Sequence, residues 1–247
     1  MKQLIKAEWY KIQRNTTLGY LCLAIFTIKI ISMIGESALK KNIGLGQVGV
    51  LQIGDSLTAI WIGAFAGFFI ASEFQNGSIR NVLSLGKNRR YVFLAKIISM
   101  VIAIIIMLLI MAMMQTIGHT IVKEFGPMTI GTFIPFFLFN FFNMLIYHLP
   151  YAGFFTMFAF LTRKPGLTIL LAFGYEFTIL AIGGILQNYP DKNLSSFLSW
   201  FPQYYYTKTE EFLGNWEFIT NGYVVSLVFT IVPILLGIYR FQRTDIK

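Results

Sequence analysis

The stretch SLGKN at residues 84–88 is the part of the sequence closest to a phosphate-binding loop. A Walker A loop would need glycine at position 81, so that backbone amides can approach the phosphates, and serine or threonine at position 88 to hold Mg²⁺. Both positions are asparagine here, Asn81 and Asn88. The sequence therefore predicts that this chain does not bind ATP by such a loop.

The other residues that could do chemistry are few and scattered. His119 and His148 share no ligand spacing with a third residue, and Cys22 is the single cysteine. One thiol excludes both an intrachain disulfide and a zinc site built from several cysteines. We expect His119 exposed at a helix end, His148 in helix packing and Cys22 as a buried free thiol. No catalytic, cofactor-binding or metal-binding residue is predicted, and an enzyme is not expected.

Composition indicates a membrane protein. Hydrophobic residues make up 56% of the 247 residues, charged residues make up 13%, and the mean hydropathy is +0.65. A soluble domain has about a quarter of its residues charged. Residues 1–247 are therefore expected to form one all-α integral membrane domain.

Six segments are long and apolar enough to cross a bilayer, which needs about 20 residues per helix. These predicted spans are residues 17–35, 53–71, 91–117, 133–161, 167–186 and 222–239.

The positive charges predict the orientation of the spans. Most of the 20 lysines and arginines fall in segments 1–16, 72–99, 162–166 and 240–247, which six spans would place on one side. The positive-inside rule assigns this side, with both termini, to the cytoplasm. The net charge of +9 then reflects contact with anionic lipid headgroups, and no nucleic-acid partner is expected.

The leader, residues 1–16, has the pattern of an amphipathic helix lying on the membrane surface. Its apolar residues near one helical face are Leu4, Ile5, Trp9 and Ile12. We expect Trp9 in the headgroup layer and Lys11 on the cationic face. The alternative is a merely basic segment that precedes the first span.

Residues 187–221 form the only long external segment, and they are rich in aromatic side chains around Pro202. Tryptophan and tyrosine are enriched at membrane–water interfaces. We expect a short helical hairpin in the outer headgroup layer, just before the last span.

The segment between the second and third spans is basic and helix-competent. Gly77 would interrupt helical structure after the second span, Ser78 would cap a helix beginning at Ile79, and Gly86 would end it. Apolar residues would form one side of this helix and cations would flank it. The alternative is a solvated basic loop.

The same segment carries a pattern that resembles a known family. The matching residues are Glu73, Phe74, Gly77, Ile79, Arg80, Leu83, Ser84, Gly86, Arg89, Ala95 and Lys96. They are similar to the loop after the second helix in ABC-2 type transporter permeases. The leader, the six spans, the WFP stretch at residues 200–202 and the ending YRFQRTDIK agree with this resemblance, and the style is nearest to permeases of bacterial peptide exporters and lantibiotic-immunity systems.

The resemblance implies that residues 72–90 are a cytoplasmic coupling segment that docks on a separate ABC ATPase subunit. Two permease chains, expected to be identical, and two ATPase chains would form the transporter, with ATP and Mg²⁺ bound to the ATPase and no cofactor in this chain. The expected docking residues are Glu73, Gly77, Ile79, Arg80, Leu83, Leu85, Gly86 and Arg89.

Charges deep within two of the predicted spans are a further signal, because a charge at such depth costs at least roughly 2.5–3.5 kcal/mol on insertion scales. Lys29 lies in the first span and Glu176 in the fifth. The resemblance implies that these two spans meet at a dimer seam, so we expect the two residues to form an ion pair near the translocation path. The alternative is that each side chain reaches a separate water layer.

Two classes of function follow. The first is the permease subunit of an exporter in the bacterial cell membrane, moving an amphipathic or hydrophobic compound such as an antimicrobial peptide. The second is a non-transporting sensor or assembly subunit with the same fold.

Overall fold

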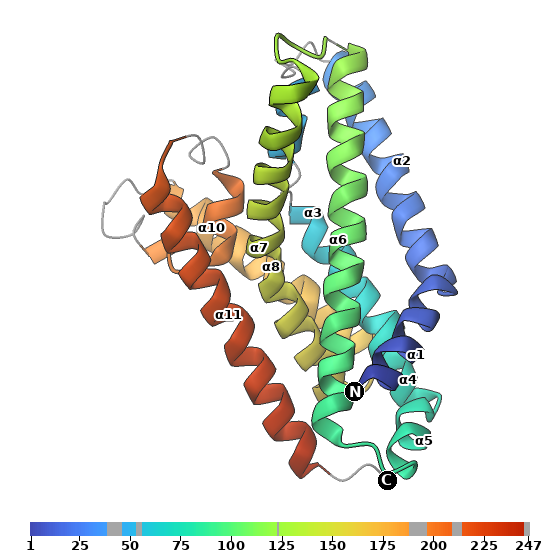
Figure 1. Cartoon of the computed structure of the whole chain (residues 1–247). Coiled ribbons are helices and arrows are strands. Elements are labelled where there is room, and N and C mark those ends of the chain that lie inside the picture. The colour runs from blue at the N-terminus through green and yellow to red at the C-terminus, as the bar shows by residue number, and fades with distance from the viewer. Residues whose placement is uncertain (39–45, 53–55, 123, 188–196, 209–213, 245–247) are drawn as a thin grey trace.

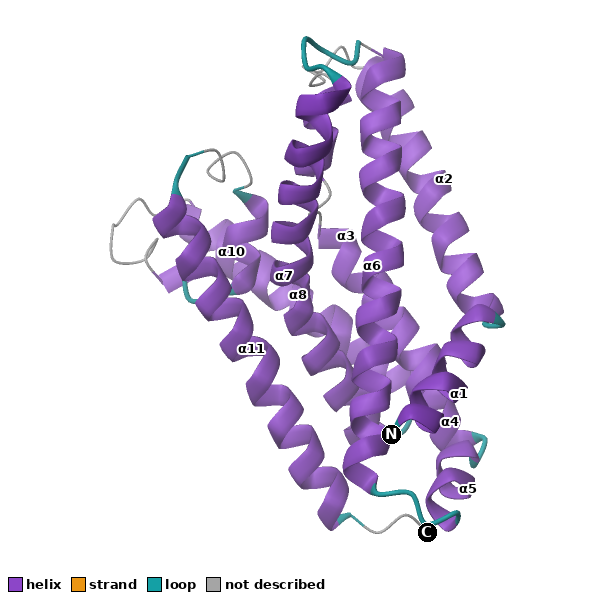
Figure 2. Cartoon of the chain, viewed as in Figure 1, coloured by secondary structure: helices purple, strands orange, loops and turns teal. Residues whose placement is uncertain are grey.

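The computed structural model describes residues 1–38, 46–52, 56–122, 124–187, 197–208 and 214–244. Within these residues every regular element is helical, and six helices are long and apolar enough to cross a membrane (Figures 1 and 2). The all-α membrane fold predicted from the sequence is therefore confirmed.

The helices follow one another with short connections. They are α1 (Lys2–Gln13), α2 (Thr16–Ala38), η1 (Gly46–Gln52), α3 (Ser56–Phe65), η2 (Ala66–Ala71), α4 (Ser72–Gln75), α5 (Ser78–Ser84), α6 (Arg89–Val122), α7 (Ile130–Thr162), α8 (Pro165–Gln187), α10 (Pro202–Thr207) and α11 (Trp216–Arg243).

The leader forms α1, which packs against the first turns of α6. Ile12 faces the core and is 4% exposed, whereas Trp9 is 46% exposed. The chain then turns directly into α2, because the side chain of Asn15 accepts a hydrogen bond from the Leu18 amide at 3.0 Å and so caps the new helix. The leader helix predicted from the sequence is confirmed.

The second span is assembled from α3, η2 and α4, and its middle part, η2, is a π-helix. Close packing against α8 accompanies this irregularity. A Cβ on Gly63 would lie 2.3 Å from the Ala172 Cβ, and one on Gly67 would lie 2.6 Å from Ile169 Cγ1. The two glycines of the GAFAG stretch therefore allow α3 and η2 to approach α8 more closely than any larger residue would.

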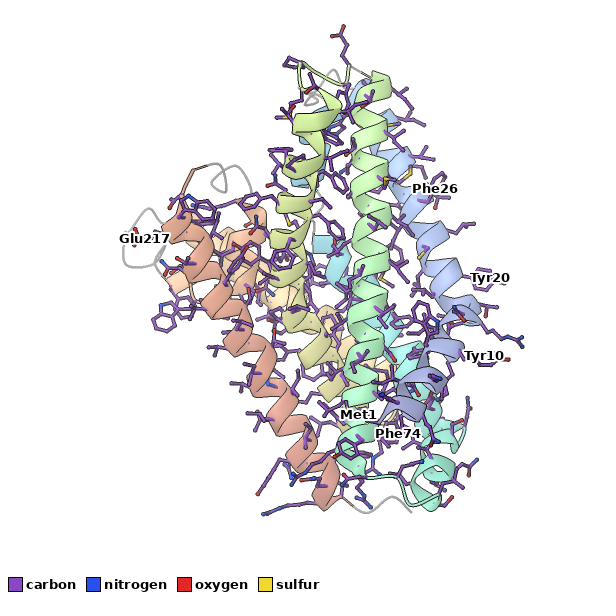
Figure 3. The ribbon with its side chains drawn as sticks, viewed as in Figure 1. Met1, Tyr10, Tyr20, Phe26, Phe74 and Glu217 are labelled. Atoms are coloured by element: carbon purple, nitrogen blue, oxygen red, sulfur yellow. The ribbon has the colours of Figure 1, made fainter. Side chains whose placement is uncertain are left out.

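Helices α6 and α7 form the centre of the bundle, and α11 packs along α7. Gly153 of α7 makes this second contact close, because a Cβ there would lie 2.8 Å from the Thr230 carbonyl oxygen. The outer faces of α2, α8 and α11 remain apolar and exposed. Figure 3 shows Tyr20 and Phe26 of α2 projecting away from the bundle, where they are 71% and 45% exposed.

Helix α10 differs from the surface hairpin that we expected before the last span. Its Pro202, Gln203, Tyr205 and Tyr206 are buried against α7 and α11. Tyrosine side chains are stable in this buried position because their hydroxyl groups find hydrogen-bond partners inside the bundle. Residues 188–196 and 209–213 of that predicted segment lie outside the described residues.

The contact of α7 with α11 gives a first prediction. Gly153→Ala should lower the free energy of unfolding by about 1–3 kcal/mol, because the added methyl group is forced against backbone. Gly174→Ala is the matched control, since a Cβ there meets no atom within 4 Å. Thermal unfolding in one detergent should show a lower melting temperature for the first variant only. Equal melting temperatures would mean that α7 and α11 are not packed this closely.

Candidate functional site: a basic helix above a buried ion cluster

Helix α5 lies at the same end of the molecule as α1 and the C-terminal end of α11 (Figure 1). We call this the basic end. Gly77 separates α4 from α5 and has φ +71°, a backbone conformation that glycine adopts without strain. Since a Cβ on Gly77 would meet no atom within 4 Å, its backbone conformation is what calls for glycine. The bend it makes sets α5 apart from the second span.

The helix itself begins and ends near the predicted residues. It starts at Ser78 with Gly77 as its N-cap, so the cap expected at Ser78 is wrong, because Ser78 is already the first residue of the helix. The predicted end is confirmed. Gly86 has φ +73°, and its amide donates to the Leu83 carbonyl at 3.0 Å.

The apolar residues of α5 that were expected to form one docking surface lie on two different faces of the helix. Ile79 is 1% exposed, and Leu83, one turn later, packs against the same core. Leu85 is 76% exposed because six residues of helix rotate it away from Ile79. Ile79 therefore holds the helix to the bundle, and the surface offered outward contains Arg80 and Leu85.

Glu73, expected to face a partner, is instead part of a cluster with Glu8, Lys11 and Lys96, which we call the ion cluster. Lys96 Nζ lies 2.6 Å from Glu8 Oε2 and 2.7 Å from Glu73 Oε1. Lys11 Nζ lies 2.8 Å from Glu8 Oε1 and 3.0 Å from the same Glu73 oxygen. Two cations and two anions from α1, α4 and α6 are thus joined at one point.

Lys96 is the most enclosed member of the ion cluster, with 1% of its surface exposed. Its ammonium lies 4.7 Å from the centre of the Phe69 ring, which adds a cation–π contact. A buried ion without a partner costs several kcal/mol, and the two carboxylates remove that cost only while both helices that carry them stay in place.

The electrostatics of α1 reflect this arrangement. Burial acts to raise the pKa of Glu8, but attraction to Lys96 and Lys11 and hydrogen bonds from both outweigh it, and the pKa lies below its ordinary 4.5. Burial acts to lower the pKa of Lys11, but Glu73 and Glu8 outweigh it, and that pKa lies above its ordinary 10.5. Both residues are therefore charged at neutral pH.

Sequence reasoning missed Glu8, and it read Lys96 only as part of a family pattern. The available signals were the one acidic residue in an otherwise cationic leader and a lysine two turns into an apolar span. Lys11, expected on a face turned to headgroups, belongs to the cluster. The placement of Trp9 in the headgroup layer stays a prediction.

Arg89 also has a role inside the chain. Its guanidinium donates to the Phe241 carbonyl at 3.0 Å and lies 5.8 Å from the centre of that ring. Carbonyl groups at the end of a helix carry partial negative charge, which a cation stabilises. Arg89 therefore connects the start of α6 to the end of α11. The family resemblance had suggested that Arg89 would instead contact a docked subunit.

The structure gives Glu176 two tyrosine partners. Its carboxylate accepts hydrogen bonds from Tyr151 at 2.9 Å and Tyr206 at 3.0 Å, and the residue is 1% exposed. The side chain is enclosed within its own chain, and its place near a translocation path or dimer seam stays a prediction. The pairing of Glu176 with Lys29, which lies on α2, stays a prediction.

The two histidines differ in outcome. His148 packs inside the bundle as expected: its Nδ1 lies 2.7 Å from the Met144 carbonyl oxygen, and its ring stacks on Tyr206 with centroids 4.9 Å apart. His119 lies in the last turn of α6 but is 1% exposed, so its expected exposure is wrong.

Comparison with known proteins supports one family. Residues 4–179, more than half of the chain, match a family model described as ABC-2 family transporter protein. This range contains α1, the ion cluster and α5. The sequence matched none of the curated proteins with which it was compared.

The ion cluster should make stability depend on pH in a defined window. The pKa of Glu8 is lowered on folding, so its contribution is present above about pH 4.5 and is lost as the pH falls through the folded-state value. The pKa of Lys11 is raised, so its contribution is present below about pH 10.5 and is lost as the pH rises further. Melting temperatures measured against pH should fall on both sides, and Glu8→Gln should flatten the acidic side. An unchanged acidic side in that variant would contradict the cluster.

Lys96→Met should lower the free energy of unfolding by about 3–5 kcal/mol, because it leaves two carboxylates with one cation. The second change, Glu73→Gln, made in the same chain, should recover part of this loss. Lys6→Met, an exposed lysine of α1, is the control and should have little effect. Chemical unfolding of the unaltered chain, of Lys96→Met and Glu73→Gln alone and of the double variant gives the coupling directly, and strictly additive losses would show that Lys96 and Glu73 do not interact.

Proposed function

The chain belongs to the ABC-2 family of transporter proteins, and from this premise we propose that it is the permease subunit of an exporter driven by a separate ATPase chain. It is a multi-pass membrane protein with six candidate spans. We place the basic end in the cytoplasm of a bacterial cell, with two copies of this chain and two ATPase subunits in the complex. ATP and Mg²⁺ would bind to the ATPase.

The observation that carries the proposal is the position of α5. It projects from the basic end on a glycine bend, buries Ile79 and exposes Arg80 and Leu85. An exposed leucine beside an arginine suits a groove with apolar walls and an acidic rim. This supports docking of a cytosolic subunit on α5.

A displacement of α5 would be felt by three helices. Glu73 is six residues before Ile79 in sequence and is joined through the ion cluster to α1 and α6. Because separating Lys96 from both carboxylates leaves buried charge unpaired, these helices are expected to move together. The π-helix η2, directly before α4, is the irregular part of the span that could absorb the change.

The apolar outer faces of α2, α8 and α11 support a substrate that enters from or passes along the lipid. We therefore favour an amphipathic or hydrophobic compound, and an antimicrobial peptide is one such compound. A water-soluble substrate would call for a polar lining, and the sequence shows no repeated polar stripe through its spans.

The docking proposal predicts a specific loss. Arg80→Glu together with Leu85→Asp should remove the ATPase from the purified complex while the permease still inserts and melts normally, because both residues lie on the exposed side of α5. Lys164→Glu, an exposed lysine at the same end, is the control for reversed charge alone. Affinity purification from membranes, followed by mass spectrometry for a chain with a Walker A loop, gives the measurement.

Undiminished ATPase recovery with the double variant would contradict docking through α5. Recovery of no ATPase with the unaltered chain would favour a non-transporting membrane subunit.

A further inference from the structure

A pocket of about 400 Å³ lies between the ends of α7 and α11 at the basic end, and none of its lining residues belongs to α5. Its lining residues are Phe160, Leu161, Arg163, Gly237, Arg240, Phe241 and Thr244. Two of these are arginines, and among the described residues that line the pocket none is acidic. The ion cluster and α5 do not account for it.

The floor of the pocket is apolar and firmly packed. Phe160 and Phe241 are 5% and 3% exposed, and their rings meet edge to face with centroids 4.6 Å apart. Gly237 keeps this region narrow, since a Cβ there would lie 2.5 Å from the Phe93 ring. The pocket is therefore a fixed feature of the α7–α11 contact.

The charge of the pocket favours an anion. The carbonyl groups at the end of α11 would otherwise make this region negative, but Arg89 already donates to the Phe241 carbonyl. Arg163, the C-cap residue of α7 with φ +54°, lines the pocket from the α7 side. Arginine is suited to phosphate because its planar guanidinium can donate two parallel hydrogen bonds.

The surroundings of the pocket favour a lipid. It lies at the ends of the candidate spans 130–162 and 216–243, which is the level of the headgroups. Leu161 on the rim of the pocket is 50% exposed, and Leu236, which lies one helical turn before Arg240 on α11, is 52% exposed. Figure 3 shows nitrogen-tipped side chains at this end of α11 below an apolar outer face. An acyl chain could follow that face while its headgroup occupied the pocket.

We infer that the pocket between α7 and α11 binds the phosphate of an anionic phospholipid through Arg163 and Arg240, with Phe160 and Phe241 beneath the glycerol. Basic pockets between membrane helices are known to hold such headgroups. The inference needs only the membrane location of the chain, so it stands or falls separately from docking of an ATPase.

The test uses the full chain in nanodiscs of phosphatidylcholine with and without phosphatidylglycerol. Phosphatidylglycerol should raise the melting temperature of the unaltered protein by roughly 3–6 °C, as expected for a site near saturation. Native mass spectrometry should detect the retained lipid. Arg163→Gln with Arg240→Gln should abolish both effects. Arg243→Gln is the matched control, because Arg243 stacks on Tyr239, with its guanidinium 4.4 Å from the ring centre, and does not line the pocket.

Four results would overturn the inference. Equal loss in Arg243→Gln would indicate a diffuse attraction to basic surface, and an equal shift with inorganic phosphate in phosphatidylcholine nanodiscs would indicate a site for a free anion. Loss of a co-purifying ATPase from the double variant, with lipid retained, would indicate a protein contact. If the double variant does not fold, Arg240→Gln alone decides, because native mass spectrometry should show a several-fold loss of retained lipid. Unchanged retention in that single variant would also overturn the inference.

Discussion

The burial of Lys96 between Glu8 and Glu73 is the constraint on which the basic end of this protein depends. An ammonium that is 1% exposed cannot remain charged without nearby anions, and these come from two other helices, α1 and α4. Lys11 closes the cluster by bridging the same two carboxylates. The leader helix α1 is therefore held to the bundle by its ion pairs as well as by the burial of Ile12, although its sequence alone resembles a surface anchor.

This constraint gives α5 its mechanical setting. The short helix is separated from α4 by the bend at Gly77, yet Ile79 holds it to the core and Glu73 lies only one turn before the bend. A force applied to the exposed residues Arg80 and Leu85 would reach α4 first, and then α1 and α6 through the ion cluster. Arg89 links α11 to these helices, because its guanidinium donates a hydrogen bond to the Phe241 carbonyl near the end of α11. The proposed docking of an ATPase on α5 would make this end the place where energy enters.

Hydrophobic length and charge distribution were enough to predict the six spans, the amphipathic leader and the existence of α5, because each is a local property of the chain. Which way a side chain points is not local. Ile79 and Leu85 looked equivalent in sequence, and only packing against the core distinguishes them. Glu73 and Arg89 were expected to face a partner, but their partners come from residues far away in the chain. Glu176 was singled out in the sequence as a costly intramembrane charge. The tyrosine hydroxyl groups that donate hydrogen bonds to it lie on α7 and α10, and the sequence did not indicate that α10 is buried.

The central claim is that α1 and α5 move as one unit through the ion cluster when ATP binds to the complex. It is tested most directly by the distance between spin labels on Trp9→Cys and Asn81→Cys, in a chain in which Cys22 is replaced by serine. In the complex with the proposed ATPase, this distance should stay narrow and unchanged between the nucleotide-free and ATP-trapped states, while the distance from Asn81→Cys to a label at the N-terminal end of α11 changes. A distance between α1 and α5 that broadens or shifts on ATP binding, with the cluster residues unaltered, would contradict the account.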